Sequence, residues 1–236
     1  MDKTIKITAG EIRTFYMTAL KKMDFNEERS RTLSEILLAT ADYPALSILF
    51  FRVTSGMIDP KALPVLAKKK HRSVTIDGSH TEPHLTCLLA MESACETAAA
   101  GGVGMVLVRG LLPVVKLRLY EKVAAAHGLI GKVREAVYEK GTDEKITHCF
   151  LAVDPGHFGE RDTLIPLLME FMQSTADPAA GTPRSIDPFF ENEGTCRSYT
   201  GSITAACKNR DLIEVPAQVI DEWNEIADAL EMKTPF

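Results

Sequence analysis

The spacing of apolar residues changes partway along this 236-residue chain, and that change constrains the fold more than any other feature. Up to about Ser55, apolar residues recur every three to four positions, which is typical of amphipathic helices. Beyond Gly56, apolar runs such as Val103–Val108 and Ile146–Val153 alternate with helix-patterned segments. Helices followed by alternating strands and helices predict an α/β or α+β layer architecture with a central sheet.

Local signals place the helices near the two ends of the chain. Thr8 and Glu11 form a capping box, which predicts a helix that ends near Met23. Asn26 is suited to cap a second helix, because an asparagine side chain can accept a bond from a free backbone N–H. A third helix is expected from about Pro44 to Ser55, and a last one from Ala217 to Leu230.

The middle of the chain supplies the elements of the expected sheet layer. Residues 132–145 are charged and weakly patterned, so no regular element is expected there. The segment Ser174–Ser185, with three Pro or Gly residues, is expected to be a loop. The remaining expected elements are a strand at Ser73–Ile76 and helices at Leu85–Ala100, Pro113–His127, Asp162–Gln173 and within Asn192–Lys208.

These elements predict one compact domain with three parts. Residues 1–60 form an N-terminal helical unit, and residues 61–158 form a central α/β sheet domain. Residues 159–236 form a C-terminal helical segment that packs back on the rest. A chain of this length can bury a sizeable core.

Composition narrows the classes of function. The net charge of −5 argues against non-specific binding to nucleic acid or to an anionic membrane. No apolar run approaches the roughly 20 residues of a membrane span, and the N-terminus lacks the apolar core of a signal peptide. A cytoplasmic location is therefore the default expectation. The five cysteines are scattered without a CxxC pair, so we expect free thiols and no zinc site.

Three titratable residues follow the strand at Ser73–Ile76 at alternate positions, namely His80, Glu82 and His84. Two histidines and a carboxylate can act as an acid–base set, and we take these three as the candidate catalytic residues. They could bind a metal only if the stretch is extended and the side chains converge, and we expect no metal. The alternative is a solvated turn that caps the next helix, with His84 near its start.

Three other residues are candidates for binding a substrate. Arg109 follows an apolar strand and could hold a carboxylate through paired hydrogen bonds, or could pair with a structural acid. Arg118 and Tyr120 lie on the next expected helix. Their side chains could face a cleft, or they could be exposed to solvent or packed in the core. His157 is expected in a surface turn, and nothing resembles a serine triad or a phosphate-binding loop.

Several segments resemble one enzyme family in their order and spacing. They are Met57–Pro60, Ile76–Gly78, Val108–Val115 running on through Tyr120 to Gly131, Phe150–Gly159 and Arg210–Pro216. Together they resemble the non-Rossmann malate/L-lactate dehydrogenase family, which includes sulfolactate and ureidoglycolate dehydrogenases and some cyclic-imine reductases. The resemblance implies that family's fold, with a helical unit at the N-terminus and a helical return at the C-terminus. It also implies a homodimer with sites near the subunit interface.

The chain departs from the family at the positions that carry its chemistry. Pro113 stands where the family has its catalytic histidine, and proline has no titratable group. The family's DSHG segment has no clear counterpart after Asp42. The motifs with which that family holds the nicotinamide dinucleotide are missing after Gly131. Compared with the family, the chain therefore resembles an internally shortened relative. We therefore expect no hydride transfer and no cofactor.

The leading hypothesis is a small-molecule enzyme. It would use the cleft that forms the active site in the dehydrogenase family for non-redox proton transfer, of the isomerase, cyclase or lyase type. In it, His80, Glu82 and His84 move protons, while Arg109, Arg118 and Tyr120 hold the substrate. One alternative is a non-catalytic homodimeric scaffold. Another is an NAD(P)-dependent reductase of a 2-keto acid or a cyclic imine.

Overall fold

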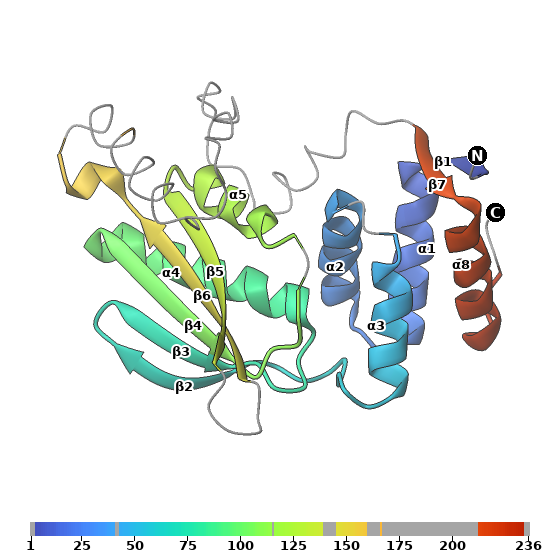
Figure 1. Cartoon of the computed structure of the whole chain (residues 1–236), viewed down its shortest axis with the longest axis horizontal. Coiled ribbons are helices and arrows are strands. Elements are labelled where there is room, and N and C mark those ends of the chain that lie inside the picture. Colours follow the sequence, from blue (N-terminus) through green and yellow to red (C-terminus); the bar gives the residue numbers. More distant parts are fainter. Residues whose placement is uncertain are drawn as a thin grey trace.

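The computed structural model describes residues 3–40, 43–114, 116–138, 145–159, 166 and 212–233. The described part has a helical unit beside a sheet layer, and both ends of the chain lie in the helical unit (Figure 1). The elements of the helical unit are β1 (Thr4–Thr8), α1 (Ala9–Lys22), α2 (Glu27–Thr40), α3 (Ala45–Thr54), β7 (Leu212–Pro216) and α8 (Ala217–Ala229).

The first two helices begin where the sequence predicts. The Thr8 hydroxyl accepts a hydrogen bond from the Glu11 N–H at 3.2 Å, and the Thr8 N–H donates to Glu11 Oε2 at 2.9 Å. This is the reciprocal pattern of a capping box. The Asn26 side chain accepts from the Arg29 N–H at 2.8 Å, at the start of α2. Both capping predictions are confirmed.

The C-terminal segment returns to the N-terminal helices. Strand β7 pairs antiparallel with β1, and α8 packs against α3. The indole of Trp223 is fully buried between the rings of Phe15 and Tyr16, at centroid distances of 5.5 and 5.4 Å. The two short strands were not expected from the sequence, whereas the helical return was.

The sheet layer is a five-stranded mixed sheet in the order β2-β3-β4-β6-β5. Strands β3 and β4 are parallel, and the other neighbouring pairs are antiparallel. Their bounds are β2 (Val65–Lys70), β3 (Ser73–Asp77), β4 (Val103–Arg109), β5 (Ile130–Tyr138) and β6 (Lys145–Val153). One row across the sheet joins Val108 of β4 to His148 of β6, and His148 to Glu135 of β5.

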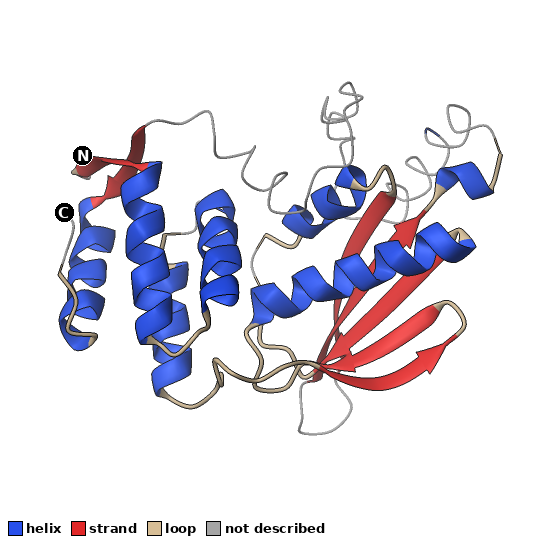
Figure 2. Cartoon of the chain, turned by 180° about the vertical axis from the view of Figure 1, so that it is seen from behind, coloured by secondary structure: helices blue, strands red, loops and turns tan. Residues whose placement is uncertain are grey.

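Helices α4 (Pro83–Gly101) and α5 (Arg118–Ala126) cover the same face of this sheet. A Cβ atom on Gly104 would lie 2.0 Å from the Ala94 carbonyl of α4, and one on Gly131 would lie 2.6 Å from Ala124 of α5. Gly104 and Gly131 both pair with Ala152, so both point to one face of the sheet. The long helix α4 crosses that face in Figure 2.

One expectation for the middle of the chain is wrong, and one strand there was not predicted at all. Strand β5 occupies a segment for which no element was expected, because the helix-covered face of β5 carries Glu135 as well as Val133 and so hides the alternation. Strand β2 is exposed along its whole length, which leaves no apolar pattern to detect. The other expected strands and helix α4 are found within two residues of their predicted bounds.

The helix expected to start at Pro113 begins only at Arg118. Leu111 and Val114 are buried in the irregular segment before it, and Lys116 adopts a φ of 56°. A left-handed residue cannot continue an α-helix, so Pro113 lies outside α5.

Some predicted elements lie outside the described residues, apart from Pro166. They are the helix at Asp162–Gln173, the loop at Ser174–Ser185 and the helix within Asn192–Lys208. Among the residues that are described, no helix combines the length and apolar character needed to cross a membrane.

Candidate functional site

The stretch that carries His80, Glu82 and His84 connects β3 to the start of α4. His80 lies in the turn with a φ of 60°, and its carbonyl accepts a hydrogen bond from the Asp59 N–H at 2.9 Å. The Gly78 N–H donates to the Arg109 carbonyl at 2.8 Å. These bonds fix the turn against the carboxyl ends of β3 and β4, which is where α/β sheets place ligands.

Glu82 is the N-cap of α4 and is only 1% exposed. Its carboxylate accepts a hydrogen bond from the Leu85 N–H at 2.7 Å. Burial raises the pKa of Glu82 to about 7, against the lowering effects of the backbone N–H donors and of the Arg29 and Arg52 charges. The turn therefore caps α4, which agrees with the alternative interpretation of a capping turn. That interpretation also expected the turn to be solvated, whereas Glu82 is buried.

His84 and Tyr120 are joined directly. His84 Nδ1 lies 2.8 Å from the Tyr120 hydroxyl, which is a hydrogen bond between α4 and α5. Tyr120 is 1% exposed, and its ring meets Phe150 of β6 edge-on at 6.2 Å. Burial, together with the nearby charge of Arg52, lowers the pKa of His84 to about 4. The imidazole is therefore neutral at pH 7.

Two arginines lie near these groups, and sequence reasoning missed both. Arg52, in the last turn of α3, points both terminal nitrogens at the Pro113 carbonyl, each at 3.4 Å. Arg29 donates to the Pro60 carbonyl and lies over the Phe25 ring. Burial lowers the pKa of each guanidinium, while the Glu82 charge opposes that effect. A cation in the last turn of a helix is ordinary, so the sequence offered no signal for Arg52.

The structure brings some of the predicted site residues together and leaves others in solvent. His84 and Tyr120 are in contact, and Glu82 lies two residues before His84, at the N-cap of α4. His80 is exposed in the turn after β3, and Arg109 is exposed at the last residue of β4. Arg118 is exposed at the first residue of α5.

Among the described residues, the other titratable candidates include no activated cysteine. Burial raises the pKa of the Cys87 thiol well above its usual value and that of Cys95 to about 12, which keeps both protonated. His157 lies in a surface turn, as predicted, with its Nδ1 3.2 Å from Asp154 Oδ2. Within the described ranges, no cluster of three His, Cys, Asp or Glu residues could hold a metal.

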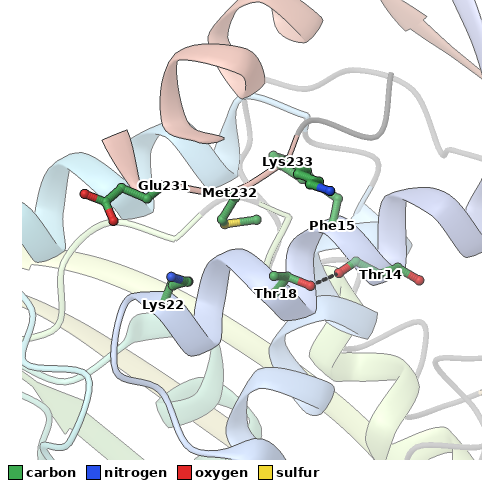
Figure 3. A pocket seen from close by; sticks show the side chains of 7 residues that line it. All are labelled: Thr14, Phe15, Thr18, Lys22, Glu231, Met232 and Lys233. Carbon is green, nitrogen blue, oxygen red and sulfur yellow. Dashed lines mark hydrogen bonds between the residues drawn. The ribbon is translucent and has the colours of Figure 1, made fainter. Parts of the chain in front are cut away.

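A separate pocket of about 300 Å³ lies in the helical unit, between α1 and the segment that follows α8 (Figure 3). It is lined by Thr14, Phe15, Thr18, Lys22, Glu231, Met232 and Lys233. None of the predicted site residues contributes to it, so we assign it no part in the candidate site.

Comparison with known proteins identifies the fold. No family model matches the sequence, and no curated protein matches it either. Solved structures do match: malate dehydrogenase from Entamoeba histolytica has a TM-score of 0.69 at 14% identity, over 99% of this chain and 100% of that one. Malate dehydrogenase from Pyrococcus horikoshii gives 0.69 at 13% identity, over 99% and 98%.

Sulfolactate dehydrogenase from Methanocaldococcus jannaschii matches equally well, with a TM-score of 0.70 at 13% identity over 98% of both chains. The chain therefore has the malate/sulfolactate dehydrogenase-like fold, and the fold that the sequence motifs indicate is confirmed. At this identity the likeness establishes the fold alone. Function has to be argued from the site.

Proposed function

We propose that this chain is a small-molecule enzyme that catalyses non-redox proton transfer, of the isomerase, cyclase or lyase type. The observation that carries the proposal is the hydrogen bond between His84 and Tyr120 beside the Arg52 charge. Buried, partnered and pKa-shifted groups of this kind are concentrated at functional sites.

The neutral state of His84 suits one role in particular. With Nδ1 engaged by Tyr120, Nε2 is the other ring nitrogen, and it carries the hydrogen when the tyrosine hydroxyl donates. A neutral imidazole at the start of a helix can donate that hydrogen to a carbonyl oxygen and stabilise the negative charge that develops there. We assign His84 this role toward a carbonyl substrate.

The remaining candidates take supporting or exposed positions in the proposal. Glu82 is too buried for a substrate to touch, so it acts as a positioning residue that holds the first turn of α4. His80 is exposed on the same turn and is the group that can take up the proton. We assign substrate orientation to Arg109, and we keep Arg118 as a peripheral contact.

A deuterium-exchange experiment tests this proposal and does not require the product to be identified. The protein is incubated in D₂O with a panel of small aldehydes, ketones and keto acids, and loss of the C–H signal next to each carbonyl is followed by proton NMR. We expect exchange with at least one compound, and a 10²- to 10⁴-fold loss in His84→Gln. His157→Gln is the matched control. Equal rates in the wild type and His84→Gln, or no exchange at all, would reject the proposal.

A second candidate is an NAD(P)-dependent reductase, which the names of the structural neighbours favour. The position of Pro113 and the missing cofactor motifs speak against it. A ligand at a hundred times its Kd stabilises a protein by about 2.7 kcal/mol. We expect no rise in melting temperature with millimolar NADH or NADPH, and a clear rise would favour the reductase instead.

The proposal also includes a cytoplasmic homodimer acting on a small molecule. The family resemblance supports the dimer, and light scattering of the purified chain measures it directly. A dimer that shows neither deuterium exchange nor cofactor binding would favour the scaffold alternative.

A further inference from the structure

The pocket between α1 and the segment after α8 has an apolar floor. Its volume is about 300 Å³, at the lower end of the range for sites that bind small molecules. Phe15 of α1 lines it and is only 3% exposed. Met232 lines it from the other segment, and a thioether side chain adapts readily to the shape of a ligand. The pocket can therefore cover the apolar part of a small molecule.

The backbone holds both walls of this pocket in place. One wall is a face of α1 that contributes three residues spaced four positions apart, Thr14, Thr18 and Lys22 (Figure 3). The other wall begins where Glu231, with a φ of 53°, ends the helical path of α8. The Glu231 N–H donates to the Asp228 carbonyl at 3.1 Å, and the Met232 N–H donates to the Ala227 carbonyl at 2.8 Å. The cavity is therefore formed by the fold itself.

Two lysines at the pocket have no acidic partner. Among the described residues, neither Lys22 nor Lys233 forms an ion pair, whereas the neighbouring Lys21 pairs with Glu27. Glu231 also lines the pocket, but its carboxylate points away from the other labelled side chains in Figure 3. Two ammonium groups against one carboxylate leave a net positive charge on the lining, which suits a singly charged anion.

The two threonine hydroxyls do not compete for that anion. Thr14 donates its hydroxyl hydrogen to the Gly10 carbonyl at 2.9 Å, and Thr18 donates to the Thr14 carbonyl at 2.8 Å. Each hydroxyl has its one hydrogen engaged, so toward a ligand it can only accept. A carboxylate also only accepts, so the lysines are the groups that can hold it.

We propose that this pocket is a binding site for a small monocarboxylate with a short apolar chain. The ammonium groups of Lys22 and Lys233 hold the carboxylate, and the chain covers Phe15 and Met232. The inference does not depend on the proposed function, because none of these residues belongs to the candidate site in the sheet layer.

NMR of protein labelled with ¹³C in the methyl groups of its nine methionines tests this site, with hexanoate as the probe. Met232→Leu assigns the Met232 signal by its disappearance. We expect that signal to shift along a saturable curve with a Kd of about 1 mM or lower. Hexylamine has the same chain with a positive charge, and acetate has the charge without the chain. Each should bind at least about tenfold more weakly than hexanoate.

Variants at exposed positions test the two parts of the proposed site. Lys22→Gln and Lys233→Gln should each weaken hexanoate binding about two- to fivefold, as expected for the loss of one exposed charge pair. Lys21→Gln is the matched control and should leave the Kd unchanged, because Lys21 pairs with Glu27 and does not line the pocket. Thr18→Phe fills the pocket and should abolish binding.

Several results would each overturn the inference. A Met232 signal that hexanoate does not shift would mean that this pocket takes no such ligand. Equal Kd values for hexanoate and hexylamine, or a loss in Lys21→Gln as large as in Lys22→Gln, would mean that the two lysines do not select an anion. Binding that survives in Thr18→Phe would lie elsewhere. The comparison of probes uses the wild type alone, so it decides the question even where a variant fails to fold.

Discussion

The helical unit and the sheet layer bury polar groups in different ways. In the helical unit, the buried hydroxyls of Ser30, Ser34 and Thr40 each donate to a backbone carbonyl of α2 or of the turn before it. The buried carboxylate of Glu35 accepts two bonds from Arg13, at 2.6 and 3.3 Å. Each of these groups has a partner, whereas the buried Asn224 Oδ1 of α8 accepts no hydrogen bond within the described residues.

The sheet layer leaves its buried titratable groups less completely satisfied. Glu82 shares its surroundings with Arg29 and Arg52, but both guanidinium groups donate to backbone carbonyls instead. His84 is held neutral, and His148 has no hydrogen-bond partner within the described part of the chain. The contrast therefore concerns titratable groups: the helical unit pairs its buried carboxylate, Glu35, with an arginine and so favours stability, while the sheet layer keeps groups whose protonation can change.

Trp223→Ala should have the largest effect on stability, because it removes the centre of the helical core. Replacing a fully buried tryptophan by alanine costs roughly 3–5 kcal/mol, and the indole here packs on Phe15, Tyr16 and Tyr43. Urea unfolding measures the loss. Phe51→Ala, at a side chain that is 61% exposed, should change stability by less than about 0.5 kcal/mol. If Trp223→Ala lost as little stability as Phe51→Ala, the conclusion that the helical unit favours stability would be wrong.

Glu82→Gln should change how stability depends on pH. The folded pKa of Glu82, about 7, lies above its ordinary value of 4.5, so the wild type loses stability as pH rises from 4.5 through 7. The full loss is roughly 3 kcal/mol, and a neutral glutamine escapes it. After about 1 kcal/mol for the weaker cap, the variant should be more stable than the wild type at pH 8 by about 2 kcal/mol.

Glu11→Gln is the matched control for this prediction, since Glu11 also takes part in a helix cap. Its pKa is lowered by hydrogen bonds to Thr8, so the charged form stabilises the fold. The control should therefore lose stability at neutral pH, where Glu82→Gln gains it. A loss at pH 8 in both variants would show that Glu82 is an ordinary cap.

The sequence predicts the elements whose signals are local. The capping residues Thr8 and Asn26 and the apolar strand β4 each carry enough information in a few residues, and the structure confirms them. Strand β5 fails because Glu135 occupies a position that the two-residue period assigns to an apolar side chain.

The candidate site is predicted only in part, because it depends on contacts between distant segments. The sequence singles out His84 and Tyr120 separately, but 36 positions separate them and no pattern predicts their hydrogen bond. The same holds for Arg52, whose position beside the Pro113 carbonyl depends on how α3 lies relative to the segment before α5. Burial is the other missing quantity, because it raises the pKa of Glu82 and lowers that of His148.

The pH-dependent effect of His84→Gln should come from a pKa shift as large as that of Glu82, and its sign is opposite to that of Glu82→Gln. The folded pKa of His84, about 4, lies below the ordinary 6.5, so the stability that the neutral ring contributes is present above pH 6.5 and is lost as pH falls toward 4. Glutamine does not titrate, so the advantage of the wild type over the variant should shrink by about 3 kcal/mol across that window. The pH effects of Glu82 and His84 oppose each other between pH 4.5 and 6.5, so the dependence of wild-type stability on pH cannot by itself reveal either effect.

Urea unfolding of each variant at several pH values, with His157→Gln as the control, separates the two effects. A wild-type advantage that stays constant from pH 7 to pH 4 would mean that His84 is solvated, and the contrast between the two regions would then rest on Glu82 and His148.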